Sequence, residues 1–69
     1  MLKSEYIVKE LKKNCNSYIQ NAEEITFKMY YRGCIFGILS ILDDSDLTRR
    51  FLDNADKFVK EFIKEKEFH

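Results

Sequence analysis

Proline and tryptophan are absent from this sequence of 69 residues, which holds only two glycines and one histidine. Glycine and proline most often mark turns, so their scarcity favours a few long helices over many short strands. The single histidine is His69, so a cysteine–histidine nucleophile pair would have to use the last residue of the chain. No Glu-x-x-His pair is present to build a carboxylate metal site in a helical bundle. We therefore expect no enzyme, no cofactor, no metal and no small-molecule ligand.

An excess of charge of either sign is missing as well, because twelve basic and twelve acidic side chains cancel to zero. A nucleic-acid-binding protein normally carries a basic excess on one face, since phosphate neutralisation supplies most of its non-specific affinity. Zero net charge also removes the long-range repulsion that keeps copies of a protein apart. The charge balance therefore argues against nucleic acid as a partner and permits self-association.

The two cysteines, Cys15 and Cys34, form neither a CxxC motif nor a disulfide framework. Both fall among apolar positions, where a free cysteine behaves as a small hydrophobic residue. Whether they are redox-active is left open. The first six residues become charged too early for a signal peptide. We therefore expect a cytoplasmic protein.

Apolar residues make up 45% of the chain, which is too many for a disordered protein. A domain of this length buries only roughly 60% of the surface of its unfolded form, so oligomerisation commonly supports it. Apolar residues recur every three or four positions and predict a single all-α domain over residues 1–69. The expected fold is a small three-helix bundle with helices at about 4–20, 22–43 and 46–66. A helical hairpin with a bent first arm is left open.

Short polar residues mark the expected helix ends. Asn21, with Glu24 three positions later, has the spacing of a capping box that would begin the second helix. The apolar register continues across Asn21, so the sequence leaves open whether the first two helices are continuous. Ser45 or Asp46 is expected to cap the third helix, and the acidic residues around them lack the spacing of a calcium-binding loop.

The central helix is apolar on both faces. At 100° per residue its large side chains fall into two stripes on opposite sides, and a helix apolar all round must be buried all round. We therefore expect the first helix to cover the stripe of Ile25, Met29 and Phe36, and the third helix to cover the stripe of Phe27, Tyr31 and Ile38. The apolar run contains Arg32 and is shorter than the roughly 20 residues that span a membrane, so no membrane span is predicted. One stripe comprises Phe27, Tyr31, Cys34, Ile38 and Leu42, and the other comprises Ile25, Met29, Phe36 and Leu39.

Three features of the central helix point to an interface. A bundle this small cannot bury all of its aromatic residues, and a surplus of exposed aromatics usually marks an interface. The surplus comprises Tyr6, Tyr30, Phe36, Phe51 and Phe68. A GxxxG pair permits the close approach of a neighbour, expected to be Phe51 or Phe58. The lone charge, Arg32, is expected to pair with Asp43 or with an acid on another helix, to point out at an edge, or to contact a partner. The candidate interface residues are Tyr30, Arg32, Gly33, Phe36, Gly37, Ser40 and Phe51.

Together these features predict a non-catalytic protein-binding module, an adaptor or inhibitor. We expect it to act by helix-mediated association with a partner protein and with itself, as a homodimer. The alternative is a small helical nucleic-acid-binding regulator that uses the lysine-rich edge of the first helix. The acidic residues Glu5 and Glu10 interleave with this edge and argue against the alternative. The edge comprises Lys3, Lys9, Lys12 and Lys13.

Overall fold

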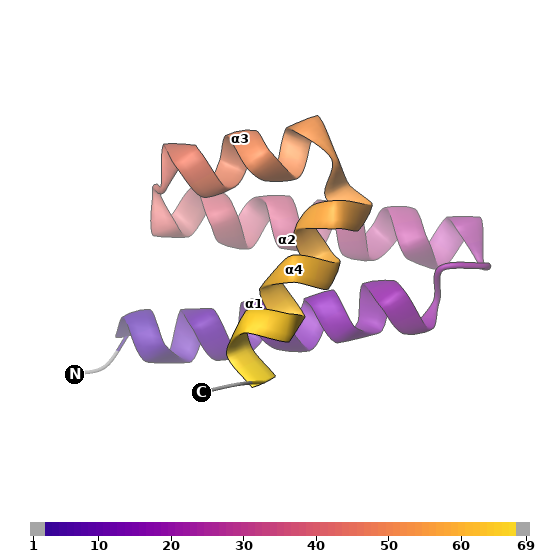
Figure 1. Ribbon diagram of the computed structural model, residues 1–69, viewed down its shortest axis with the longest axis horizontal. Coiled ribbons are helices and arrows are strands. Elements are labelled where there is room, and N and C mark those ends of the chain that lie inside the picture. Colours follow the sequence, from indigo (N-terminus) through magenta and orange to yellow (C-terminus); the bar gives the residue numbers. More distant parts are fainter. Residues whose placement is uncertain (1–2, 68–69) are drawn as a thin grey trace.

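The computed structural model describes the backbone of residues 3–67 and the side chains of residues 5–65, and it confirms the all-α class. Within this range the chain forms four helices (Figure 1). Helices α1 and α2 lie side by side and run in opposite directions, α3 returns along the end of α2, and α4 crosses over α1. The helices are α1 (Lys3–Gln20), α2 (Ile25–Leu42), α3 (Ser45–Asp53) and α4 (Ala55–Glu67).

The expected third helix is two helices, because the chain breaks at Asn54. The backbone of Asn54 is extended, at φ −159° and ψ 94°. Its side-chain oxygen accepts a hydrogen bond from the Lys57 N–H at 3.1 Å, which caps the start of α4. Asparagine competes with the helical backbone for hydrogen bonds and so favours such ends. The prediction of one helix over 46–66 is therefore wrong, and the break turns α4 across α1.

The turn between α1 and α2 also differs from the predicted one. Asn21 completes α1, since its side-chain nitrogen donates to the Ser17 carbonyl at 2.8 Å. The carbonyl of Asn21 accepts from the Glu24 N–H at 3.0 Å, which closes the turn. Glu24 is the N-cap residue of α2 and makes no side-chain capping bond. The expected capping box is thus wrong, and α1 and α2 are separate helices.

The acidic residues between α2 and α3 form a turn and a cap, as the sequence predicted. Asp43 takes the left-handed conformation at φ 54°, and its N–H donates to the Leu39 carbonyl at 3.1 Å. A carboxylate oxygen of Asp44 accepts from the N–H groups of Asp46 and Leu47, both at 3.1 Å. The cap is therefore Asp44, one residue before the expected Ser45.

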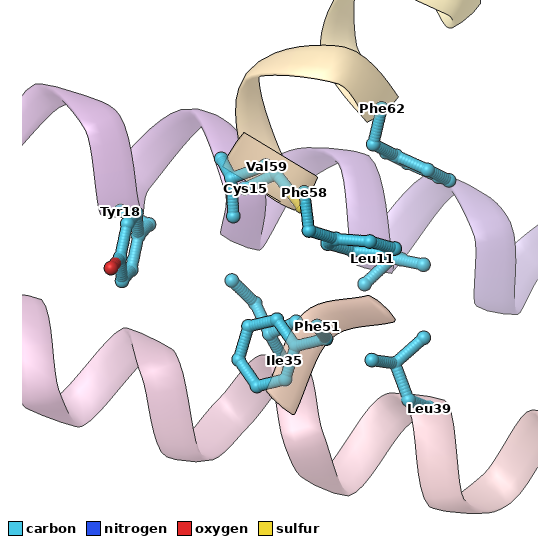
Figure 2. Packing of buried hydrophobic residues seen from close by; sticks show 9 residues of the cluster. All are labelled: Leu11, Cys15, Tyr18, Ile35, Leu39, Phe51, Phe58, Val59 and Phe62. Atoms are coloured by element: carbon cyan, nitrogen blue, oxygen red, sulfur yellow. The ribbon is translucent and has the colours of Figure 1, made fainter. Parts of the chain in front are cut away.

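The core draws on all four helices. Figure 2 shows side chains of α1 facing those of α2, with aromatic rings of α3 and α4 packed among them. The ring of Phe51 meets the ring of Phe58 edge to face at 5.6 Å, and the ring of Phe62 stacks on Phe58 at 5.8 Å. The buried residues are Leu11, Cys15, Tyr18, Ile35, Leu39, Phe51, Phe58, Val59 and Phe62.

Helix α2 is covered on one side only, which corrects the expectation of a sandwiched central helix. Its two buried residues, Ile35 and Leu39, point toward α1 (Figure 2), and α3 also contacts α2. Helix α4 packs on α1 and α3, so it does not provide the second cover. Of the stripe expected beneath the first helix, only Leu39 is buried, and Ile25, Met29 and Phe36 are exposed.

Candidate protein-binding surface

The uncovered side of α2 is a continuous surface without a charged side chain. Its residues recur at spacings of three and four and span an arc of roughly 160° around the helix. Every one of them is exposed, although the surface is mostly apolar. We call this surface the outer face of α2; it comprises Ile25, Thr26, Met29, Tyr30, Gly33, Phe36, Gly37, Ser40 and Ile41.

Small residues run along the middle of the outer face. A Cβ atom built on Gly33 or Gly37 meets nothing within 4 Å among the described residues, so the expected crossing by Phe51 or Phe58 is wrong. Each glycine costs about 1 kcal/mol of helix propensity relative to alanine, and the fold of a single copy gives no packing reason for that cost. Ser40 is also small, and its hydroxyl donates to the Phe36 carbonyl at 3.0 Å, so the hydroxyl already has an acceptor within its own helix.

The two charged side chains of α2 both point away from the outer face. The Lys28 ammonium lies 3.4 Å from a carboxylate oxygen of Asp56 and 5.6 Å from the centre of the Tyr18 ring. The Arg32 guanidinium lies 5.6 Å from the centre of the Phe51 ring. Arg32 therefore packs on an aromatic ring of the core, and among the side chains of residues 5–65 it forms no ion pair with Asp43 or with another acid.

The structure brings together five of the seven predicted interface residues. Tyr30, Gly33, Phe36, Gly37 and Ser40 share the outer face. The other two, Arg32 and Phe51, do not belong to it; the Phe51 side chain is completely buried and is not available to a partner.

Sequence reasoning missed three large members of the outer face. Ile25 and Met29 were expected beneath the first helix, and Ile41 was not considered. The positions of Gly33 and Gly37 could have indicated this face, since a helical projection centred between them places Met29 and Ile41 on the same side and Ile25 at its edge.

The largest pKa shifts belong to two buried side chains, Tyr18 and Cys15. The Tyr18 hydroxyl donates to a carboxylate oxygen of Asp56 at 2.7 Å. Burial and this hydrogen bond raise the pKa of Tyr18 to about 12, and the same bond, with the nearby Lys28, lowers the pKa of Asp56. Burial raises the pKa of the Cys15 thiol to about 12, which keeps this thiol protonated at neutral pH. Among residues 3–67, no group of three or more metal-ligating side chains gathers.

An open hollow continues the outer face toward α3. It lies between the end of α2 and α3, has a volume of about 580 Å³, and is lined by Ser40 on one side and Leu52 on the other. Leu52 is half exposed and extends the apolar surface, while Arg49 and Asp53 form a polar margin.

The lysine-rich edge of α1 has no comparable continuity. Lys9 and Lys13 are exposed and Lys12 is half-buried, but the exposed Glu5 and the half-buried Glu10 share the helix with them. The side chain of Lys3 and the predicted surplus aromatic Phe68 lie outside the described residues; the other surplus aromatic of the termini, Tyr6, is exposed.

Helix α2 also has the length and composition of a membrane span, with 18 residues at a mean hydropathy of 1.2. This window is longer than the apolar run considered from the sequence, because it begins at Ile25. Comparisons with family models, with characterised proteins and with solved structures give no match.

Proposed function

We propose that this protein is a non-catalytic protein-binding module, an adaptor or inhibitor that uses the outer face of α2 to occupy the surface of another protein chain. The observation that carries the proposal is an entire helix face that is apolar, uncharged and uncovered in a small domain. A single exposed apolar residue is ordinary, whereas a contiguous patch of this kind marks an interaction site. A helix that presents an apolar face to a groove is a recurrent mode of protein recognition.

A protein partner fits the charges around the outer face better than a lipid surface does. Acidic residues stand at both ends of α2, with Glu23 and Glu24 before it and Asp43 and Asp44 after it. Anionic headgroups attract basic segments and are repelled by these carboxylates. For α2 to span a membrane, it would have to leave the bundle, which would expose the core around Leu39.

The acidic ends disfavour nucleic acid for the same reason, since binding to phosphates requires a basic surface. The alternative regulator would have to use Lys9 and Lys13 of α1. A mobility shift with duplex DNA and with structured RNA at low salt tests it, and we expect no shift. We also propose a cytoplasmic location, which suits the two free cysteines.

Site-specific photo-cross-linking in cells tests the proposed function. A photoreactive phenylalanine analogue replaces Met29 on the outer face, and in a control chain it replaces Lys13, which is exposed on α1. We expect the probe at position 29 to form covalent adducts with protein at a yield several-fold above that of the control. Equal yields at the two positions, or none at position 29, would show that the outer face binds no protein.

A further inference from the structure

Resting on the proposed function, we infer that the occupant of the outer face is a second copy of this chain. The two α2 helices cross each other at Gly33 and Gly37, about a two-fold axis. Three independent features of the outer face support this pairing: the position of its small residues, its apolar area and its lack of charge.

The small residues sit where a two-fold axis requires them. Gly33 and Gly37 lie near the middle of α2, with the bulky Met29 and Tyr30 before them and Ile41 after them. In a two-fold interface the residues nearest the axis meet their own counterparts. Two backbones approach closely there only if those residues are small, and bulky side chains on either side then pack around the crossing. The open space above both glycines leaves room for such a neighbour.

The apolar area suffices for a specific dimer. The exposed fractions are 69% for Ile25, 52% for Met29, 63% for Tyr30, 42% for Phe36 and 68% for Ile41. With roughly 200 Å² for each complete side chain, these fractions give about 600 Å² per copy and about 1,200 Å² for the pair. Stable specific interfaces begin at roughly that total, and the glycine backbones and Ser40 add to it.

The charge pattern matches a copy of the same surface. An uncharged face offers no complement to a charged partner, whereas a second copy presents an equally uncharged face. The Ser40 hydroxyl is already bonded within its helix, so a copy would cover it without leaving an unpaired donor.

The acidic ends of α2 explain why the helices cross instead of lying along each other. Two aligned helices would place Glu24 and Asp44 of one copy against carboxylates of the other in either orientation. In helices that cross at about 40° near their midpoints, the ends are separated by roughly 12 Å, which exceeds the Debye length of about 8 Å at physiological salt.

Sedimentation equilibrium of the complete chain, over a hundredfold range of concentration, tests the pairing. Gly37→Leu adds a bulky side chain at the crossing, at a position where a Cβ atom meets nothing within 4 Å in a single copy. Ile41→Lys, which places a charge on the outer face, is a second variant in case the first misfolds. Gln20→Leu is the matched control, since it adds the same side chain at an exposed position on α1. Circular dichroism checks that every variant keeps its helix content.

We expect the wild type and Gln20→Leu to sediment at twice the chain mass of 8.3 kDa. The two outer-face variants are expected to sediment as monomers, at half the apparent mass of the wild type, with unchanged helix content. A wild type that is monomeric throughout, or a dimer that both outer-face variants leave intact, overturns the inference. If a monomeric wild type still cross-links another protein through position 29, the proposed function survives and only self-pairing is lost. If it instead floats with phosphatidylglycerol vesicles and forms no protein adduct, lipid is the occupant and both proposals fail.

Discussion

Replacing Phe51 by alanine is expected to cost far more stability than the same change at Phe36, although both residues are aromatic members of apolar segments. The Phe51 side chain is fully buried, and its ring contacts the ring of Phe58 and the guanidinium of Arg32. Removing such a buried ring costs about 3–5 kcal/mol, from lost transfer energy and from the cavity left behind. A domain of this length has a total stability of roughly 3–10 kcal/mol, so Phe51→Ala removes a large part or all of it.

Phe36 is 42% exposed, and solvent fills the space that its removal leaves. Only part of its transfer energy is lost, about 1–1.5 kcal/mol in a single copy. Urea unfolding followed by circular dichroism measures both costs. The measurement is made in the Ile41→Lys background, so that dimer dissociation does not add to the cost at Phe36. A cost for Phe36→Ala equal to that of Phe51→Ala would refute the assignment of Phe51 to the core and of Phe36 to the outer face.

Three further predictions concern titration and helix propensity. The thiol of Cys15 has an ordinary pKa of 9.0 and a folded pKa of about 12. Its contribution to the free energy of unfolding is therefore intact below pH 9.0 and is lost as the pH rises toward 12. The loss reaches about 4 kcal/mol, and chemical unfolding at several pH values should show a flatter decline for Cys15→Ala. The pKa of Asp56 is lowered in the folded state, so its pH dependence has the opposite sign. Its contribution to the free energy of unfolding is present above the ordinary pKa of 3.8 and is lost as the pH falls through the folded value. Asp56→Asn should remove this loss of stability in acid. In monomers, Gly33→Ala should raise the free energy of unfolding by about 1 kcal/mol, because the added methyl group meets no neighbour; a decrease would mean that the site is already occupied.

The sequence predicted the helical class and α1 well, because apolar residues on one face of an otherwise charged segment have one stable arrangement. It did not predict the break at Asn54, since the apolar spacing of 46–66 continues across that residue. The Asn54 side chain caps the Lys57 N–H and so begins a new helix, and the spacing of apolar residues does not indicate this cap. The location of the cap at Asp44 was similarly out of reach, since the adjacent Ser45 and Asp46 have the same chemistry.

The prediction that α2 is buried on both sides was the largest error made from the sequence. A helix that is apolar all round has no preferred side, so periodicity alone does not assign Ile35 to the core or Phe36 to the surface. The tertiary arrangement assigns them, because the break before α4 sends that helix over α1 and leaves one side of α2 uncovered. Five of the seven interface candidates share the outer face because they cluster around Gly33 and Gly37, whereas Phe51 lies in the core, which the sequence did not indicate without the break.

The central claim is that a second copy of this chain covers the outer face of α2. Isotope-filtered nuclear Overhauser spectroscopy on a mixture of labelled and unlabelled copies tests it most directly. We predict intermolecular contacts from the methyl groups of Met29 and Ile41, which are exposed in a single copy, and none from the buried methyl groups of Leu11. A spectrum in which Met29 and Ile41 show only contacts within their own copy would contradict the claim.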